Sequence, residues 1–187
     1  KKFVVDRIGS QHIIKTLCIT DKLKSINFDL LPNAFIIKAT HGSGWNIIIR
    51  DKRKINKKII LKKCKNFLSM NYYYHGRERQ YLDIKPRIMI EALMLNDDGS
   101  VPEDYKFFCF NSVVKYIQLD LARCSNHKRA IFDINWSMLP LEIEFPKYDG
   151  NIDKPKNLEY MIELASKLTK NINFARVDMY NYKNHIY

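Results

Sequence analysis

Glycine, proline and cysteine are all scarce in this 187-residue sequence, which has six, six and four of them. It contains no repeat and no low-complexity linker. The four cysteines, Cys18, Cys64, Cys109 and Cys124, form no CxxC pair and no cysteine–histidine spacing typical of a zinc site. We therefore expect four reduced thiols in a cytoplasmic protein, with Cys109 buried because it lies in an apolar run.

Long hydrophobic runs are absent too. The longest, at 35–37 and 47–49, are far too short to span a bilayer, and no signal peptide is visible. The sequence starts at Lys1 without a methionine, which leaves room for a missing upstream segment. Because 46% of the residues are hydrophobic and 12% aromatic, we expect one substantial core or two small subdomains rather than disorder.

Acidic residues are outnumbered by basic ones, 20 against 32, which gives a net charge of +12. Such an excess favours anionic partners: nucleotides, nucleic acid, acidic polymers or the inner membrane surface. The basic residues are scattered, however, and only 52–65 is a dense run. Genomic base composition also explains sequences rich in Lys, Asn and Ile, so we expect no nucleic-acid partner.

The apolar pattern predicts an α+β protein in which strands outnumber helices. Residues 3–26 are expected to form a helix or turn and then a loop, and 71–83 an aromatic and polar connection. Helices are expected over 57–70 and from 153–156 onward. Strands are expected at 35–37, 46–50, 87–95, 105–110, 113–119, 174–180 and from 185.

A glycine-rich loop separates the first two expected strands. Glycines let backbone amides approach a phosphate, and Lys38 ends the preceding strand, where its ammonium could reach one. Neither a Walker nor a Rossmann pattern is present, because here strand follows strand. Two interpretations stay open: residues 41–44 form a flexible lid over a nucleotide, or they form an ordinary hairpin turn.

Three charged residues lie within expected strands. Arg176 and Asp178 are two residues apart, so their side chains share one face. They form either a structural ion pair or a phosphoryl-transfer site in which Asp178 holds a hard cation and Arg176 neutralises phosphate charge. Glu91 is either an exposed strand residue or a hydrogen-bond acceptor for an adenine amino group.

Taken in order, seven segments resemble the ATP-grasp superfamily, and their local sequence resembles its TupA-like family. Together they extend over nearly the whole chain. They are 31–44 (LPNAFIIKATHGSG), 71–78 (NYYYHGRE), 84–91 (IKPRIMIE), 104–111 (DYKFFCFN), 125–129 (SNHKR), 132–136 (FDINW) and 175–178 (ARVD).

The resemblance implies an enzyme that uses ATP and Mg²⁺ to phosphorylate a carboxylate to an acylphosphate, which an amine or another nucleophile then attacks. Arg176 would stabilise the transferring phosphoryl group, Lys128 or Arg129 would reach the phosphates, and Asp178 would hold magnesium. Lys38 would bind the ATP phosphates, and His41, Gly42, Ser43 and Gly44 would form the lid. Glu91 and the backbone of Leu93 would contact adenine, and Asp104 would either hold the ribose or position Lys106.

The implied fold is an ATP-grasp fold of two strand-rich lobes clamping ATP, truncated at both ends. Residues 1–30 would be a remnant of a preceding segment, 31–90 the first lobe, and 91–187 a second lobe incomplete at its C-terminus. The family normally continues into a Glu-x-Thr-Phe segment whose glutamate is a main magnesium ligand. It also commonly reads GSGGN where Trp45 stands here, and the bulky ring could stiffen the lid or stack on a ligand.

The leading hypothesis is a carboxylate–amine ligase of cell-surface polysaccharide or teichuronopeptide biosynthesis, cytoplasmic or at the inner membrane surface. Its partners would be ATP, a carboxylate and an amine or sugar acceptor, such as an anionic polymer precursor. Glycosyl transfer is a second hypothesis, although no Asp-x-Asp motif supports it. A nucleic-acid module using 72–74, Arg77, Arg79 and Tyr81, and a degenerate ATP-binding domain, are the others.

Overall fold

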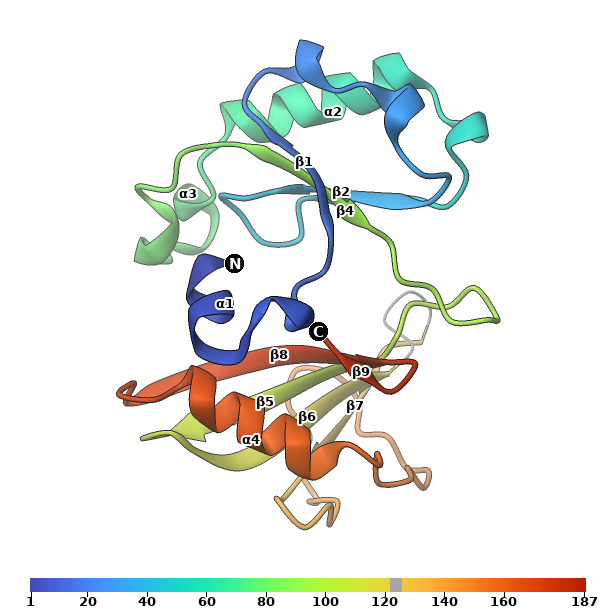
Figure 1. Ribbon diagram of the computed structural model, residues 1–187. Coiled ribbons are helices and arrows are strands. Elements are labelled where there is room, and N and C mark those ends of the chain that lie inside the picture. The colour runs from blue at the N-terminus through green and yellow to red at the C-terminus, as the bar shows by residue number, and fades with distance from the viewer. Residues whose placement is uncertain (122–125) are drawn as a thin grey trace. The chain divides into compact units, whose positions relative to one another are not determined.

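The computed structural model describes residues 1–121 and 126–187, and Cys124 and Ser125 therefore lie outside the described residues (Figure 1). The chain forms two compact units. The first unit is Ile14–Leu93, and the second unit combines Lys1–Ile13 with Met94–Tyr187. Each unit contains an antiparallel sheet and at least one helix, which confirms the expected α+β class.

The sheet of the first unit has the strand order β1 (Thr16–Thr20), β4 (Ile88–Ala92), β2 (Phe35–Ala39) and β3 (Asn46–Ile49), all antiparallel. Side chains alternate between its two faces. One face is apolar and buried, and it packs with Ile60 and Cys64 of helix α2 (Lys57–Ser69). The opposite face carries Lys38 and Glu91.

Helix α2 begins at a polar cap, because the side chain of Asn56 accepts a hydrogen bond from the amide of Ile59 at 3.2 Å. Its buried residues Ile60 and Cys64 are four residues apart, and the partly buried Phe67 and Leu68 follow Cys64 by three and four residues, as the sequence predicts. The rest of the first unit is connected by short helical turns. They are η2 (Leu23–Ser25), η3 (Phe28–Leu30), η4 (Lys52–Lys54), α3 (Tyr73–Gly76) and η5 (Arg79–Tyr81).

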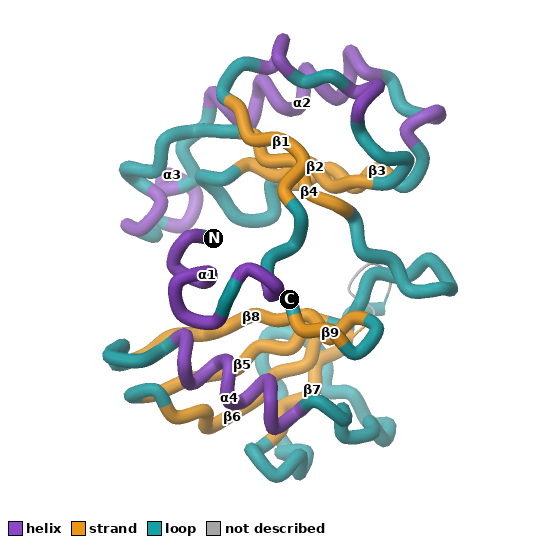
Figure 2. Tube along the Cα trace, viewed as in Figure 1, coloured by secondary structure: helices purple, strands orange, loops and turns teal. Residues whose placement is uncertain are grey.

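The sheet of the second unit has the order β7 (Lys128–Phe132), β6 (Val113–Leu121), β5 (Asp104–Phe110), β8 (Phe174–Tyr182) and β9 (His185–Ile186). Helix α4 (Leu158–Leu168) lies across one face of it (Figures 1 and 2). That face is apolar and buries a core whose largest members include Phe107, Phe132 and Met161. The other face carries most of the charged strand residues.

The N-terminal residues belong to the second unit. Helix α1 (Lys2–Ile8) places Arg7 so that its Nη1 donates to the carbonyls of Leu168 and Lys170, both at 2.8 Å. A guanidinium at this point satisfies carbonyls left free at the end of α4. After α1, the short helix η1 (Ser10–His12) ends at His12, whose Nδ1 hydrogen-bonds with the carbonyl of Ile186 at 2.7 Å.

Most expected helices and strands are confirmed within two or three residues, but the structure also contains elements that the sequence does not predict. Strands β1 and β7 form where the sequence predicts none, and α3 and η5 form inside the expected connection at 71–83. The strand expected from 185 is the second arm of a hairpin with β8, whose turn residues Lys183 and Asn184 both have positive φ. Cys109 is buried as expected, and the three described cysteines are free thiols.

No helix in the described part of the chain combines the length and the apolar character needed to cross a membrane.

Candidate active site

Lys38 and Glu91 form an ion pair on the open face of the first sheet. Glu91 lies directly opposite Ile36, and Lys38 is two residues further along β2, so the two side chains share this face. Lys38 Nζ lies 2.7 Å from Glu91 Oε2. The side chain of Glu91 is 3% exposed and that of Lys38 33% exposed, so the exposed-residue interpretation of Glu91 is wrong.

The glycine-rich loop is held by aromatic packing. The Trp45 ring stacks on Phe67 with centroids 5.9 Å apart and meets Tyr72 edge-on at 5.2 Å. A Cβ on Gly42 would lie 2.7 Å from the Trp45 ring, so only glycine fits under it. His41 is buried, and its Nε2 hydrogen-bonds with the Phe67 carbonyl at 2.8 Å. Of the two roles expected for Trp45, stiffening of the loop is the one this packing favours.

At position 44 the backbone conformation, and not a neighbouring side chain, requires glycine. The φ of Gly44 is +71°, and a Cβ there would meet nothing within 4 Å, so the requirement comes from the backbone rather than from neighbours. The amide of Asn46 donates to the Gly44 carbonyl at 2.9 Å, and Ala39 donates to the Trp45 carbonyl at the same distance. The loop that includes Ser43 is thus tied to both strands that it joins.

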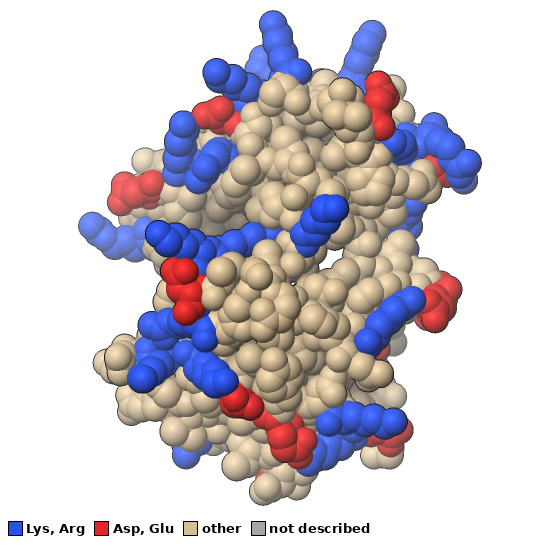
Figure 3. All heavy atoms as spheres, viewed as in Figure 1, with Lys and Arg blue, Asp and Glu red and all other residues tan. Residues whose placement is uncertain are grey.

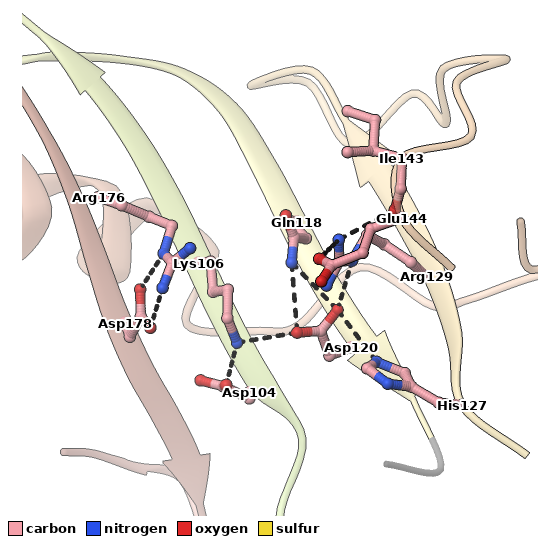
Figure 4. A network of polar contacts seen from close by, with 10 residues as sticks. All are labelled: Asp104, Lys106, Gln118, Asp120, His127, Arg129, Ile143, Glu144, Arg176 and Asp178. Carbon is pink, nitrogen blue, oxygen red and sulfur yellow. Dashed lines mark hydrogen bonds and ion pairs between the residues drawn. The ribbon is translucent and has the colours of Figure 1, made fainter. Parts of the chain in front are cut away.

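A buried polar network occupies the face of the second sheet opposite α4 (Figure 4). Asp120 of β6 is its centre and accepts from Arg129 Nε of β7 at 2.7 Å, from Gln118 Nε2 of its own strand at 3.1 Å and from Lys106 Nζ of β5 at 3.0 Å. Lys106 also contacts the carboxylate of Asp104. Five side chains from three strands therefore form one connected group.

The charges in this network nearly balance, which makes their burial tolerable. Asp104, Lys106, Asp120 and Arg129 are each less than 10% exposed. Burial alone would raise the pKa of Asp120, but hydrogen bonds from Arg129 and Lys106 outweigh it and hold the pKa well below the ordinary value. Asp120 therefore stays ionised at neutral pH.

A β-bulge brings these residues to one face. Near the β5–β6 turn Cys109 is opposite Val114, but the next pair is Phe108 with Tyr116, so Lys115 is an extra residue. Beyond the bulge Lys106 lies opposite Gln118, and Asp104 opposite Asp120. Because one residue of slip exchanges the faces of a strand, an unbulged hairpin would turn Gln118 and Asp120 toward α4.

Arg176 and Asp178 continue the polar face onto β8, where Asp178 lies directly opposite Lys106. Arg176 Nε donates to Asp178 Oδ1 at 2.8 Å, and Nη2 donates to Oδ2 at 3.0 Å (Figure 4). This hydrogen bonding raises the pKa of Arg176. The two side chains are 47% and 42% exposed, so, unlike the buried network, they are available to a ligand.

Comparison with protein families decides the identity. The family model described as TupA-like ATPgrasp matches residues 1–187, the whole chain. The chain belongs to the TupA-like ATP-grasp family. No curated protein sequence matches this ATP-grasp chain.

Solved structures agree with this ATP-grasp fold. D-alanine–D-alanine ligase from Bacillus anthracis matches with a TM-score of 0.55 at 16% identity, and the same enzyme complexed with ATP with 0.53 at 14%. ATP-grasp ligase PsnB complexed with a minimal precursor matches with 0.50 at 11%. Each match covers all of this chain but 52%, 51% and 48% of the respective ligase. The chain thus spans about half the length of these ligases.

The predicted ATP-grasp site residues fall into two groups. Lys38, Glu91 and residues 41–44 lie in the first unit, and Leu93 is its last residue. Asp104, Lys106, Arg176 and Asp178 share one face of the second unit's sheet. Lys128 does not share it: it lies opposite Leu121 and alternates with Arg129, so Arg129 is the member of that pair that joins the network.

Four residues of the network are not predicted as site residues from the sequence. They are Gln118 and Asp120, His127, whose Nε2 lies 3.4 Å from Asp120 Oδ1, and Glu144, which lies 3.1 Å from Arg129 Nη1. The signal for the first two was available, since both are polar residues at alternate positions of an apolar strand. Glu144 comes from a loop 15 residues beyond Arg129, and no local pattern marks it.

Magnesium fits this ATP-grasp chain only in part. Among residues 1–121 and 126–187, no group of three or more His, Cys, Asp or Glu side chains is placed to hold a metal ion. Mg²⁺ in nucleotide enzymes usually binds one or two carboxylates and completes its shell with phosphates and water. The half-exposed carboxylate of Asp178 fits one such ligand.

Proposed function

We propose that this chain carries part of the active site of a Mg-ATP-dependent carboxylate–amine ligase of cell-surface polysaccharide or teichuronopeptide biosynthesis. The single observation that carries the proposal is the polar face of the second sheet, where an accessible Arg176–Asp178 pair adjoins buried Lys106. Membership of the ATP-grasp family supports the ATP-dependent ligase class. The carboxylate substrate and the amine or sugar acceptor bind in the complete protein, which we place in the cytoplasm.

In this proposal the ATP-binding residues of the first unit are Lys38, the loop 41–44, Glu91 and the Leu93 backbone, and those of the second unit are Asp104 and Lys106. A carboxylate oxygen attacks the γ-phosphorus and ADP leaves, which gives an acylphosphate. The amine then attacks the acyl carbon, loses a proton and expels phosphate. Magnesium, held partly by Asp178, would neutralise phosphate charge during the first step.

Arg176 is the proposed catalytic residue, because its guanidinium is exposed while its partner carboxylate fixes its orientation. Charge redistributes over the phosphoryl oxygens during transfer, and a positioned cation stabilises that state more than the ground state. Arg129 is a positioning residue here rather than a catalytic one, since its side chain is buried and its Nε and Nη1 already donate to Asp120, Glu144 and the Ile143 carbonyl. It holds Asp120, which in turn holds Lys106.

The test is an ATP-hydrolysis screen of the full-length protein against amino acids and uronic acids, with hydroxylamine present to trap an acylphosphate. We expect ADP and a hydroxamate in equal amounts with one class of acid, and both products to form about a hundred- to a thousandfold more slowly with Arg176→Met. ATP binding without ADP release for any acid would instead identify a binding module without catalysis. ADP release without hydroxamate would contradict the acylphosphate route.

A further inference from the structure

Helix α2 presents a face of lysines to solvent. Lys58, Lys62, Lys63 and Lys65, here called the lysine face, are all exposed. In Figure 3, Lys and Arg side chains project outward from the part of the first unit that α2 occupies in Figure 1. Among the residues that the structure describes, none of the four forms an ion pair. The fold therefore does not use these charges internally.

The lysines are placed against the electrostatic preferences of a helix. The first turn of α2 contains no acidic residue, although negative charge is favoured there, and begins with Lys57 and Lys58. Lys58 and Lys62 are four residues apart and Lys62 and Lys65 three, so like charges are neighbours along the surface. Such an arrangement costs helix stability, and an external anion would offset that cost.

Helix α4 of the same chain follows the ordinary pattern. It has Glu159 in its first turn and Lys167 in its last, and Lys167 Nζ pairs with Glu163 four residues earlier at 2.6 Å. A lysine-rich genomic composition acts on both helices alike. The contrast between α2 and α4 therefore points to a requirement specific to α2.

Exposed aliphatic side chains occur on α2 itself and in the segment held at its first turn. Ile59 is 55% exposed and lies three and four residues before Lys62 and Lys63, so it is among them on the helix surface. Leu30 of η3 is 83% exposed, and its neighbour Asp29 pairs with Lys57 at 2.9 Å, which fixes η3 beside the start of α2. Protruding aliphatic residues surrounded by lysines suit the interface of a bilayer.

We propose that the lysine face, with Ile59 and Leu30, docks the protein on an anionic lipid bilayer. Lysines next to an acidic membrane each strengthen binding by on the order of fivefold at low salt. The aliphatic side chains favour lipid over nucleic acid, because isoleucine and leucine offer no ring on which a base could stack. This inference concerns a surface of the first unit and does not depend on the ligase reaction.

Co-sedimentation of the full-length protein with vesicles tests the proposal. Vesicles of phosphatidylcholine with about a third phosphatidylglycerol should bind it at low salt, and pure phosphatidylcholine vesicles should not. Lys58→Glu/Lys62→Glu/Lys65→Glu should lower the partition coefficient by at least a hundredfold. Ile59→Ala should lower it several-fold, with a loss that persists at high salt because it is apolar.

The matched control is Lys2→Glu/Lys156→Glu/Lys170→Glu, three exposed lysines of the second unit whose replacement changes the net charge equally. It should bind vesicles nearly as well as the unchanged protein. Equal loss in the control overturns the proposal in favour of diffuse charge, and binding to soluble polyphosphate but not to vesicles overturns the lipid assignment. Lys58→Ala/Lys62→Ala/Lys65→Ala, which should increase helicity, answers any objection that the triple glutamate variant misfolds.

Discussion

Lys38 Nζ donates a 2.7 Å hydrogen bond to the buried carboxylate of Glu91, on the face of the first sheet opposite α2. The pair fixes where the ammonium points before any nucleotide arrives. Lys38→Met should weaken ATP binding by about tenfold to a hundredfold, as expected for a lost charge-assisted hydrogen bond. Isothermal calorimetry on the full-length protein measures this, with Lys156→Met as the control.

The same variant should also lower the melting temperature, because Glu91 is left buried without this partner. The double variant Lys38→Met/Glu91→Gln also removes the buried negative charge, so it should recover stability but not ATP affinity. If ATP binding returns together with the melting temperature, Lys38 acts through folding alone and the binding role is wrong.

Arg176→Met should reduce turnover by about a hundred- to a thousandfold while changing the ATP dissociation constant little. The chain supplies a matched control in Arg53, which donates Nε and Nη2 to Asp51 at 2.9 and 2.8 Å across the same two-residue spacing. Arg53→Met should leave turnover unchanged. Both variants should keep nearly the stability of the unchanged protein, since exposed pairs contribute little. Steady-state kinetics measures turnover in both variants. If Arg176→Met and Arg53→Met lose turnover equally, Arg176 has no catalytic role.

Asp178→Asn should raise the magnesium concentration that gives half-maximal turnover, because an amide is a poorer ligand than a carboxylate for a hard cation. A magnesium titration at saturating ATP measures the shift. Asp51→Asn, which breaks the comparable pair at Arg53, serves as control. An unchanged magnesium midpoint with normal turnover would mean that the metal is held elsewhere.

Asp120→Asn should destabilise the second unit by about 3–5 kcal/mol at pH 7, because Arg129 and Lys106 lose the buried carboxylate that they share. The folded-state pKa of Asp120 is lowered, so its contribution is fully present above about pH 4 and is lost as the pH falls further. The difference in the free energy of unfolding between the unchanged protein and Asp120→Asn should therefore shrink below pH 4.

Chemical denaturation followed by the fluorescence of Trp136 measures the free energy of unfolding of both proteins. The Trp136 ring reports on the second unit because it stacks on Phe132, which belongs to the core of that unit. A Trp45→Phe background removes the signal of the first unit. Asp97→Asn, which changes an exposed carboxylate paired with Lys183, is the control and should have little effect. If the difference in the free energy of unfolding stays constant from pH 7 to pH 3, the pKa of Asp120 is not lowered by these contacts.

Gly42→Ala should displace the Trp45 ring, because the new methyl would lie 2.7 Å from it. In a Trp136→Phe background the emission of Trp45 should shift to the red as the ring meets water. Gly44→Ala tests the alternative, since it strains the backbone without touching the ring. If Gly44→Ala shifts the emission as much as Gly42→Ala does, the packing of Trp45 depends on the loop conformation and not on contact with Gly42.

Local sequence patterns predict most helices and strands of the fold, but they do not predict β1 and β7. Strands β1 and β7 are edge strands. Every side chain of β1 is half-buried or exposed, so it shows no clear alternation, and β7 is short and begins with two cations. Tertiary pairing rather than local preference makes both into strands.

For the candidate site, the sequence predicts which face of β8 carries Arg176 and Asp178, because that needs only the period of a strand. It does not predict that Asp120 meets Lys106. That contact depends on the extra residue Lys115, and no sequence signal distinguishes the bulged hairpin from the regular one. Nor does it choose Arg129 over Lys128, since that choice depends on the register of β7 against β6.

The placement of α1 has a consequence for the order in which the chain matures on the ribosome. The first unit is continuous in sequence, so all of it has emerged once Leu93 leaves the exit tunnel. The second unit must wait, because β8 pairs with β5 and Arg7 docks on carbonyls at the end of α4. During synthesis α1 therefore remains without its docking site until residue 170 is made, and nascent chains halted before that point should leave it open to protease.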